Sequence, residues 1–504
     1  MKIEEMISAN RADCTGCEAC ANACPQNAIA MRRDAEGFAY PEIDHALCKE
    51  CGRCDDVCPT LNFVKKYPKT LPKIFAAINP DNKVRRHSSS GGVFGALSEL
   101  ILKDGGVIFG AGFDKDFHVV HKSARTLEEL DNLRGSKYVQ SQIGDVYRQV
   151  KDALKSTRVL FSGTPCQCAG LKSFLGKDYD NLLTVDVICQ GVPSPAVWEY
   201  YIDMFSYAHE IKGVNFASKR FGWKFAHMEI DFADRESYLC PIHQDAYGGT
   251  YLCGLNGRPS CTACKFKFPS VQSDLTLGDA LGVQDYAPDM FDERGTSIVL
   301  IHTPKGKDFF DRAGLRTQAV DFLNVVTRNP RLTTSTIADN RRKVFFIEFV
   351  KYTNRIANMK KYLEKDDVNI RQQISDKTQR ALIQSYEEIF DYYRKNAERN
   401  ILVVTPPLDD KAQEFLDGYF EKNLPDCGVY FMQLEGDGQL VCKEKMSTLT
   451  FELDEDPDML TEFAKQFHVT EIFAENKVKY ESPTLVKWIN HCGLPANIFS
   501  LSAS

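Results

Sequence analysis

Two short cysteine runs near the N-terminus have the spacing of iron–sulfur ligands. Residues 14–25 read CTGCEACANACP and residues 48–59 read CKECGRCDDVCP, so each run is C-x2-C-x2-C-x3-C-P. At this spacing three thiolates hold one corner of a 4Fe–4S cube, and the fourth cysteine crosses to a second cube. The two runs therefore predict a pair of clusters that share crossed ligands.

The crossing rule assigns each cysteine to one of the two clusters. The expected ligands are Cys14, Cys17, Cys20 and Cys58 for the first cluster, and Cys48, Cys51, Cys54 and Cys24 for the second. Gly16 and Gly52 allow tight turns around the sulfurs. Two four-thiolate zinc sites are the alternative, which the repeated run with its trailing Cys-Pro disfavours. The pattern is that of a bacterial two-cluster ferredoxin, which carries electrons and binds no substrate.

A further cysteine lies where a predicted strand gives way to a helix. The apolar run 159–163 predicts a buried strand, and Thr164 then acts as N-cap with Pro165 at the first helical position. Gln167 completes a T-x-x-Q capping box. Cys166 is therefore expected in the first turn, where free amides and the helix dipole favour a thiolate.

Cys189 has a similar place at the end of the apolar run 182–189, just before a helix capped by Ser194. Both Cys166 and Cys189 thus fall at the carboxyl ends of strands, where open α/β sheets bind ligands. Cys168, two residues beyond Cys166, points to another side of the helix and is expected to be a core thiol.

The C-x-x-C pair formed by Cys261 and Cys264 lacks a second pair, and spacing alone leaves three interpretations. Cys166 and Cys189 could join it around a third 4Fe–4S cluster. Alternatively, a local zinc site could use the pair with Cys253 or Cys240. In the third interpretation Cys166 is a reactive nucleophile, and the pair is redox-active or structural.

The chain of 504 residues is long enough for two to four domains. We expect an α+β or α/β multidomain protein: a two-cluster ferredoxin fold at 1–68, a central α/β domain at 74–330, a helical segment at 331–399 and a small α/β domain at 400–504. The last domain has strand-like runs at 401–407, 427–434 and 471–475, separated by helical patterns. A structural or partner-docking role is expected for it.

Composition excludes several classes of function. The net charge of −7 argues against a nucleic-acid or anionic-membrane surface. No run approaches the ~18–20 apolar residues that span a bilayer, and the polar start MKIEEMISANRADC lacks the apolar core of a secretion signal. Because the sequence shows neither feature, we expect a cytoplasmic protein. In that reducing compartment clustered cysteines usually bind metal.

Five ordered motifs closely resemble the family of the beta subunit of coenzyme F420-reducing hydrogenase and F420-linked dehydrogenases. They lie at 88–97 (SSSGGVFGAL), 134–141 (RGSKYVQS), 163–171 (GTPCQCAGL), 186–195 (DVICQGVPSP) and 258–279 (RPSCTACKFK through SDLTLGD). The resemblance covers the ferredoxin segment and residues 74 to about 305. It implies a flavin domain that holds FAD beside a 4Fe–4S cluster.

The resemblance makes the third cluster the preferred interpretation, with Cys166, Cys189, Cys261 and Cys264 as ligands. Two departures stand out: Cys168 replaces a more usual aliphatic residue, and GDALGV at 278–283 replaces a more usual G-D-x-W-G. The implied FAD contacts are Ser89, Ser90, Gly91, Gly92, Gly135, Ser136, Lys137, Tyr138, Gly163 and Thr164. No catalytic residue can be assigned.

The flavin prediction depends on the resemblance, because GAGFDK at 110–115 lacks the third glycine of a dinucleotide fingerprint. Hydroxyls and amides of HSSSGG at 87–92 could cradle a pyrophosphate, although a simple N-cap is the alternative. Lys137 could face a phosphate or an anionic reduced flavin, although a solvated surface lysine is more common.

The predicted function is an iron–sulfur flavoprotein oxidoreductase. Clusters carry single electrons and FAD exchanges one or two, so electrons would pass between the three clusters, FAD and a two-electron carrier or substrate. The partner would be a ferredoxin, the deazaflavin F420 or another oxidoreductase subunit, in a homo- or hetero-oligomer. The alternative is an electron-relay subunit, docked through residues 330–504, without a substrate site. The acidic charge disfavours a redox sensor that binds nucleic acid.

Overall fold

The computed structural model divides the chain into two compact units, Met1–Ile383 and Gln384–Ser504. The residues described are 2–364 without 69, 70 and 353, then 377–382, 384, 385 and 388, and the strands at 399–405, 427–435, 439–444, 447–452, 471–475 and 496–499. No helix in this described part is both long and apolar enough to cross a membrane.

The N-terminal segment has a ferredoxin-type arrangement of short elements around the cysteine runs. Its elements are α1 (Ile3–Ala9), α2 (Ala19–Ala23), β1 (Ile29–Arg33), β2 (Ala39–Ile43) and α3 (Arg53–Asp56), with β1 and β2 antiparallel. Gly16 and Gly52 have φ of +68° and +72°, which confirms the predicted tight turns. Glu18 also has positive φ, +63°, and is the N-cap of α2.

A mixed eight-stranded sheet forms the centre of the first unit, in the order β13-β3-β12-β11-β7-β6-β4-β5. Its strands are β3 (Lys73–Ile78), β4 (Val107–Phe113), β5 (Val119–Ala124), β6 (Val159–Gly163), β7 (Leu182–Val187), β11 (Leu275–Asp279), β12 (Ser297–Ile301) and β13 (Arg316–Ala319). Strands β4, β6, β7 and β11 are parallel, and antiparallel pairing adds β5 at one edge and β12, β3 and β13 at the other.

Helices cover both faces of this sheet. Val159 and Phe161 of β6 pack in one core with α7 (Val146–Ala153) and α8 (Pro165–Leu175). Leu160 points the other way, into the core with α5 (Val93–Lys103) and α12 (Pro304–Arg312). Burial on both faces explains why the sequence of this strand is a continuous apolar run.

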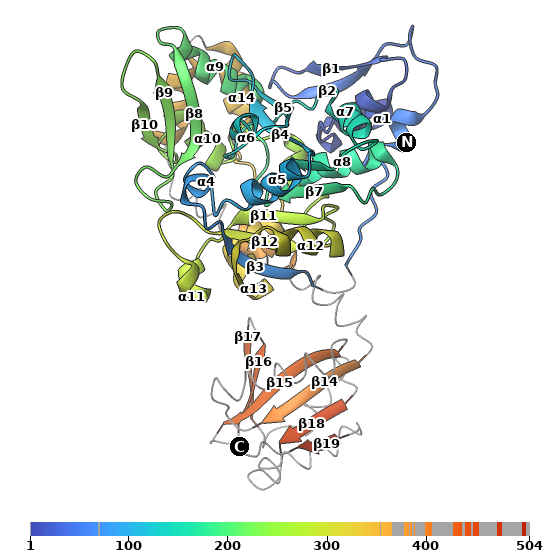
Figure 1. Cartoon of the computed structure of the whole chain (residues 1–504), viewed down its shortest axis with the longest axis vertical. Coiled ribbons are helices and arrows are strands. Elements are labelled where there is room, and N and C mark those ends of the chain that lie inside the picture. The colour runs from blue at the N-terminus through green and yellow to red at the C-terminus, as the bar shows by residue number, and fades with distance from the viewer. Residues whose placement is uncertain are drawn as a thin grey trace. The chain divides into compact units, whose positions relative to one another are not determined.

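A second, antiparallel sheet in the first unit was not predicted. It comprises β8 (Ile211–Ser218), β9 (His227–Phe232) and β10 (Tyr238–Pro241). Trp198, Phe216, Tyr247 and Phe345 join one core beside it, and Figure 1 shows α9, α10 and α14 near these strands. The helices are α9 (Pro195–Ser206), α10 (Ala246–Leu252), α14 (Arg342–Lys351) and α15 (Arg355–Glu364). Part of the expected helical segment therefore belongs to the first unit.

Four short helices complete the first unit: α4 (Asn82–Arg86), α6 (Leu127–Asp131), α11 (Val283–Tyr286) and α13 (Phe322–Arg328). The second unit contains a six-stranded sheet in the order β17-β16-β15-β14-β18-β19. Its strands are β14 (Arg399–Thr405), β15 (Cys427–Glu435), β16 (Gln439–Glu444), β17 (Ser447–Glu452), β18 (Glu471–Glu475) and β19 (Ala496–Phe499). The three expected strands correspond to β14, β15 and β18, and the helical patterns between them lie outside the described residues.

Candidate functional site

The structure brings the predicted ligands of the first ferredoxin cluster around one cavity. Cys14, Cys17, Cys20 and Cys58 line it together with apolar side chains of α1, and its volume is about 350 Å3, part of it open to solvent. Burial raises the pKa of Cys17 to about 12, and the neighbouring thiols of Cys58 and Cys14 contribute to the rise. We call these four residues the inner site.

The outer site comprises Cys48, Cys51, Cys54 and Cys24, and it is more accessible. Cys51 is exposed, and the other three are half-buried. The backbone amide of Glu50 donates to Cys48 Sγ at 3.4 Å, and that of Ala28 donates to Cys24 Sγ at 3.2 Å. Such donors suit thiolates that carry negative charge on a cluster.

The third site begins at α8, where the predicted capping box is present. The amide of Thr164 donates to Gln167 Oε1 at 3.0 Å. Thr164 Oγ1 lies 3.2 Å from Cys166 Sγ. Cys189 follows β7 by two residues, and the amide of Gly191 donates to its sulfur at 3.3 Å.

The C-x-x-C loop lies against the loop that contains Cys189. The amide of Arg258 donates to the carbonyl oxygen of Val192 at 2.9 Å, and Pro193 pairs with Gly257 in an antiparallel bridge. A Cβ added at Gly191 would lie 3.1 Å from Cys261 Cβ. The backbone thus brings together segments that are some 70 residues apart in the chain.

The four thiols of this third site are close enough to interact electrostatically. Burial raises the pKa of Cys166 well above its ordinary value, and Cys264, Cys189 and Cys261 add to the rise. The predicted thiolate at the start of α8 is therefore wrong for a free thiol, because loss of hydration outweighs the helix dipole. These four half-buried thiols would repel one another as thiolates, so together they form a donor set that suits a positively charged metal centre.

The local zinc interpretation stays a prediction beside the third cluster. A zinc ion needs its sulfurs about 2.3 Å from one point, and no three His, Cys, Asp or Glu side chains of the described part are placed to bind a single ion. The cysteines of the inner and outer sites likewise include no three that are placed to bind a single ion. A cube fits such sites because each thiolate binds a different iron. Cys240 lies within β10, beside Tyr238.

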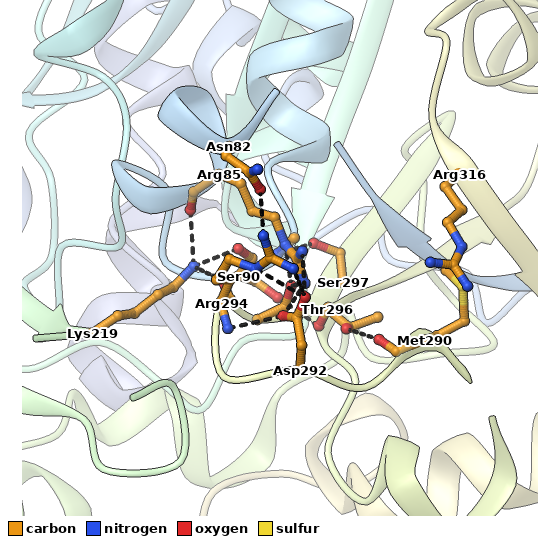
Figure 2. Close-up of polar contacts among 12 residues, drawn as sticks. Asn82, Arg85, Ser90, Lys219, Met290, Asp292, Arg294, Thr296, Ser297 and Arg316 are labelled. Carbon is orange, nitrogen blue, oxygen red and sulfur yellow. Dashed lines mark hydrogen bonds and ion pairs between the residues drawn. The ribbon is translucent and has the colours of Figure 1, made fainter. Parts of the chain in front are cut away.

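The two motifs expected to contact FAD are in contact with each other, since Ser136 Oγ donates to Ser89 Oγ at 3.1 Å. Within the first motif, Ser90 Oγ donates to the carbonyl oxygen of Thr296 at 2.7 Å, and the amide of Gly91 donates to Ser297 Oγ at 2.9 Å (Figure 2). These two groups therefore have partners inside the protein. Gly92, with φ of +85°, is the N-cap of α5.

Lys219 binds the backbone of the segment HSSSGG at 87–92, which we call the serine–glycine loop. Its ammonium donates to the carbonyl oxygens of Arg85, Ser90 and Arg294 at 3.0, 2.6 and 2.7 Å (Figure 2). Burial lowers the pKa of Lys219 to about 7. Asp279, the last residue of β11, is buried and interacts with both Ser90 and Lys219.

Replacing Gly91 with alanine is expected to lower the free energy of unfolding of the first unit by about 1–3 kcal/mol. The added Cβ would lie 2.3 Å from the carbonyl oxygen of Ala77 and 2.6 Å from the amide nitrogen of Ser297. Both are backbone atoms of the central sheet and cannot rotate away. Chemical denaturation would measure the change, with Gly257→Ala as control, because a Cβ there meets no atom within 4 Å. Equal stabilities of the two variants would contradict the prediction.

The second motif connects the serine–glycine loop to the third site through aromatic rings. Lys137 Nζ donates to the carbonyl oxygens of Asn132 and Arg134 at 3.1 and 2.7 Å, and burial lowers its pKa to about 7. The ring of Tyr138 lies 5.2 Å from that of Tyr251, which interacts with Cys189 and Cys261.

The remaining residues expected to contact FAD are Gly163, Thr164 and Gly135. Gly163 and Thr164 directly precede α8, and a Cβ added at Gly163 would lie 3.1 Å from Gln167 Oε1. Gly135 has φ of +77°, and a Cβ added there meets no atom within 4 Å.

The ferredoxin segment is bound to the central sheet and its helices by buried polar contacts. The carboxylate of Glu18 accepts from the amides of Ile143 and Gly144 at 2.9 and 3.0 Å. Arg148 of α7 donates to the carbonyl oxygens of Asn22 and Cys24 at 2.7 and 2.9 Å. Figure 1 shows this segment beside α7 and α8.

The inner site and the third site meet at α8. A Cβ added at Gly170 would lie 3.0 Å from Cys17 Cβ and 3.1 Å from its sulfur. Gly170 follows Cys166 by four residues, so both lie on one face of the helix, one turn apart. One helix therefore carries a ligand candidate of the third site and contacts a ligand candidate of the inner site.

Comparison with known proteins identifies both parts of this arrangement. Residues 156–321 match the family model described as the C terminus of the coenzyme F420 hydrogenase/dehydrogenase beta subunit. This segment of the chain carries the family's C-terminal domain. Residues 13–62 match a 4Fe-4S dicluster domain, so in this chain the domain typical of the beta subunit follows an iron–sulfur domain.

Three relatives each match 62% of the chain. An uncharacterized protein of Methanocaldococcus jannaschii is 26% identical, with 88% of its own length matched. An F(420)H(2) dehydrogenase subunit of Methanosarcina mazei is 26% identical, with 84% matched. The coenzyme F420-dependent sulfite reductase of Methanocaldococcus jannaschii is 23% identical, with 48% matched. The chain is thus an iron–sulfur electron-transfer protein related to oxidoreductase complexes.

Four residues with structural roles near the sites were not predicted from the sequence: Arg258, Glu18, Gly170 and Lys219. Arg258 lies three residues before Cys261, a proximity that could have drawn attention to it. The other three have no local signal, because Glu18 binds Ile143, Gly170 contacts Cys17 and Lys219 binds Ser90, each more than 100 residues away along the chain.

Proposed function

We propose that this protein is an FAD-dependent iron–sulfur oxidoreductase in which electrons move along the outer site, the inner site and the third site to a flavin. The observation that carries the proposal is the meeting of Cys166, Cys189, Cys261 and Cys264 beside the motif residues Gly163, Thr164 and Tyr138. The residues fit 4Fe–4S clusters by ligand type, by mutual placement and by their N–H···S donors.

The order of the sites follows from burial and contact. The outer site includes the exposed Cys51 and is the part that an external one-electron donor or acceptor could approach. The inner site is buried and contacts α8 at Gly170. The third site lies one helical turn further, next to Tyr251 and Tyr138.

The chain's own residues would bind and orient the flavin. FAD, when bound, supplies the exchange of one or two electrons. Ser89 and Ser136, joined by their hydroxyls, would offer polar contacts at the meeting of two loops. Lys137, whose ammonium donates to two backbone carbonyl oxygens, would face an anionic group. Lys219 and Asp279 would hold the serine–glycine loop in shape.

The two-electron partner would be deazaflavin F420 or a related carrier, and the complex a hetero-oligomer with another oxidoreductase subunit. Support comes from the Methanosarcina mazei relative, which is by its name one subunit of an F(420)H(2) dehydrogenase. The alternative is an electron-relay subunit without a flavin. The internal partners of Ser90 and Gly91 favour this alternative, because they leave fewer free donors for a pyrophosphate.

Anaerobic purification followed by quantification of iron, sulfide, zinc and flavin tests the proposal. We expect about twelve irons and about one FAD per chain, four irons for each of three cubes. About eight irons with one zinc would replace the third cluster by a zinc site. About twelve irons without flavin would support the relay subunit instead.

A further inference from the structure

Arg258 is a buried cation at the junction of the ferredoxin segment and the central part of the first unit. Arg258 is only 1% exposed. Nε donates to the carbonyl oxygen of Cys14 at 3.0 Å, Nη1 donates to Gln140 Oε1 at 2.9 Å, and Nη2 donates to the carbonyl oxygen of Ala39 at 3.0 Å. The guanidinium also lies over the ring of Tyr40, 4.4 Å from its centroid.

All three hydrogen-bond acceptors of Arg258 are uncharged. Among the described residues, no carboxylate oxygen comes within ion-pair distance of its guanidinium. Glu18 and Cys261 both sense its charge. The Glu18 carboxylate is bound by two backbone amides, and burial raises the pKa of Glu18 to about 7. Burying a cation without a charged partner is unfavourable, so a negative group is expected close by.

The inner site supplies that negative group. Arg258 binds the backbone of Cys14, and Cys14 lines the cavity with the other three thiols of the inner site. Four thiolates around a 4Fe–4S core carry a net negative charge, and adding one electron makes that charge larger. Net charge near a cluster is one of the factors that set its reduction potential. A fixed cation favours the more negative, reduced state.

We propose that Arg258 is a positioning residue whose buried charge raises the reduction potential of the inner cluster. The proposal rests on the ligands assigned to the inner site above. It also gives the position of Arg258 a reason: the amide of Cys261 donates to the carbonyl oxygen of Arg258 at 3.1 Å, so the same residue stands beside a ligand candidate of the third site. The charge of Arg258 thereby favours reduction of the inner cluster. That cluster lies next to the third site, which would accept its electron.

The test is a redox titration monitored by electron paramagnetic resonance on the anaerobically purified full chain. In Arg258→Gln, the reduced-to-oxidised ratio of one ferredoxin-domain cluster is expected to fall at least tenfold at the wild-type midpoint potential, about 59 mV for one electron. Arg258→Lys keeps the charge and is expected to retain most of the wild-type potential. Arg33→Gln is the matched control, because Arg33 pairs with Glu199 in a half-exposed ion pair across the same junction.

A second variant keeps the test decisive if Arg258→Gln fails to bind iron. Gln140→Glu retains Arg258 and places a carboxylate where Gln140 Oε1 now accepts its hydrogen bond. Neutralising the cation in this way is expected to lower the same potential. Unchanged potentials in the iron-loaded variants, or an equal shift in Arg33→Gln, would overturn the proposal. A wild-type protein with about eight irons and no flavin would refute the proposed function, yet would leave this titration intact.

Discussion

Replacing Cys261 with serine is expected to lower the iron content from about twelve to about eight atoms per chain. Cys261 stands in the short helix Pro259–Ala263 and lies close to Gly191 of the loop that contains Cys189. With the third site empty of iron, a chemical reductant would still reduce the ferredoxin clusters. Electron transfer from them to the flavin should fall by at least ~10–100-fold, the loss known for weaker changes around metal sites.

Cys168→Ser is the matched control for this experiment. Cys168 lies on α8 two residues from Cys166, is fully buried and has its sulfur 3.9 Å from the carbonyl oxygen of Val185. The control variant should keep about twelve irons, because Cys168 faces the sheet rather than the third site. Iron and flavin assays with visible absorption spectra would check both proteins. Loss of iron in Cys168→Ser, or full iron content in Cys261→Ser, would contradict the assignment of the third-site ligands.

Replacing Gly170 with leucine is expected to displace Cys17 and to abolish the inner cluster. Even a Cβ would lie 3.0 Å from both Cys17 Cβ and the hydroxyl oxygen of Tyr147. Overpacking of this kind costs about 1–3 kcal/mol of stability, and here the displaced side chain is a metal ligand. Electrons should then accumulate on the outer cluster and fail to reach the third site.

Stopped-flow reduction with detection of the flavin absorbance would measure that block. Gly170→Ala should show a milder slowing, since neighbours have to move by only a few tenths of an ångström. Gly257→Leu, at a glycine with open space around it, should transfer electrons at the wild-type rate. Normal transfer in Gly170→Leu would show that the inner site does not connect to α8.

Local spacing was sufficient to predict the features that depend on neighbours in sequence. The cysteine runs placed Cys14, Cys17 and Cys20 together because seven residues cannot separate them far. The capping box at Thr164 and Gln167 and the strand at 159–163 are present as expected, since turn chemistry and apolar runs act locally. The ferredoxin-type segment and a large sheet covered by helices follow from these patterns.

Features that depend on distant segments could not be read from the sequence. The thiolate expected at Cys166 failed because the helix dipole is visible in a sequence, whereas burial by other segments is not. The sheet β8–β10 and the antiparallel insertion of β12 depend on pairing across the fold. Arg258 gave no signal as a buried cation, since its acceptors, the carbonyls of Cys14 and Ala39, lie more than 200 residues away.

The bonds that Glu18, Arg148 and Arg258 make across the junction have a kinetic consequence. They prevent the N-terminal module from acting as a diffusing shuttle. The distance of each electron-transfer step within the molecule is then fixed, and the rate of each step is first order. Dilution should slow only the arrival of the outside partner, never the passage of charge within one molecule.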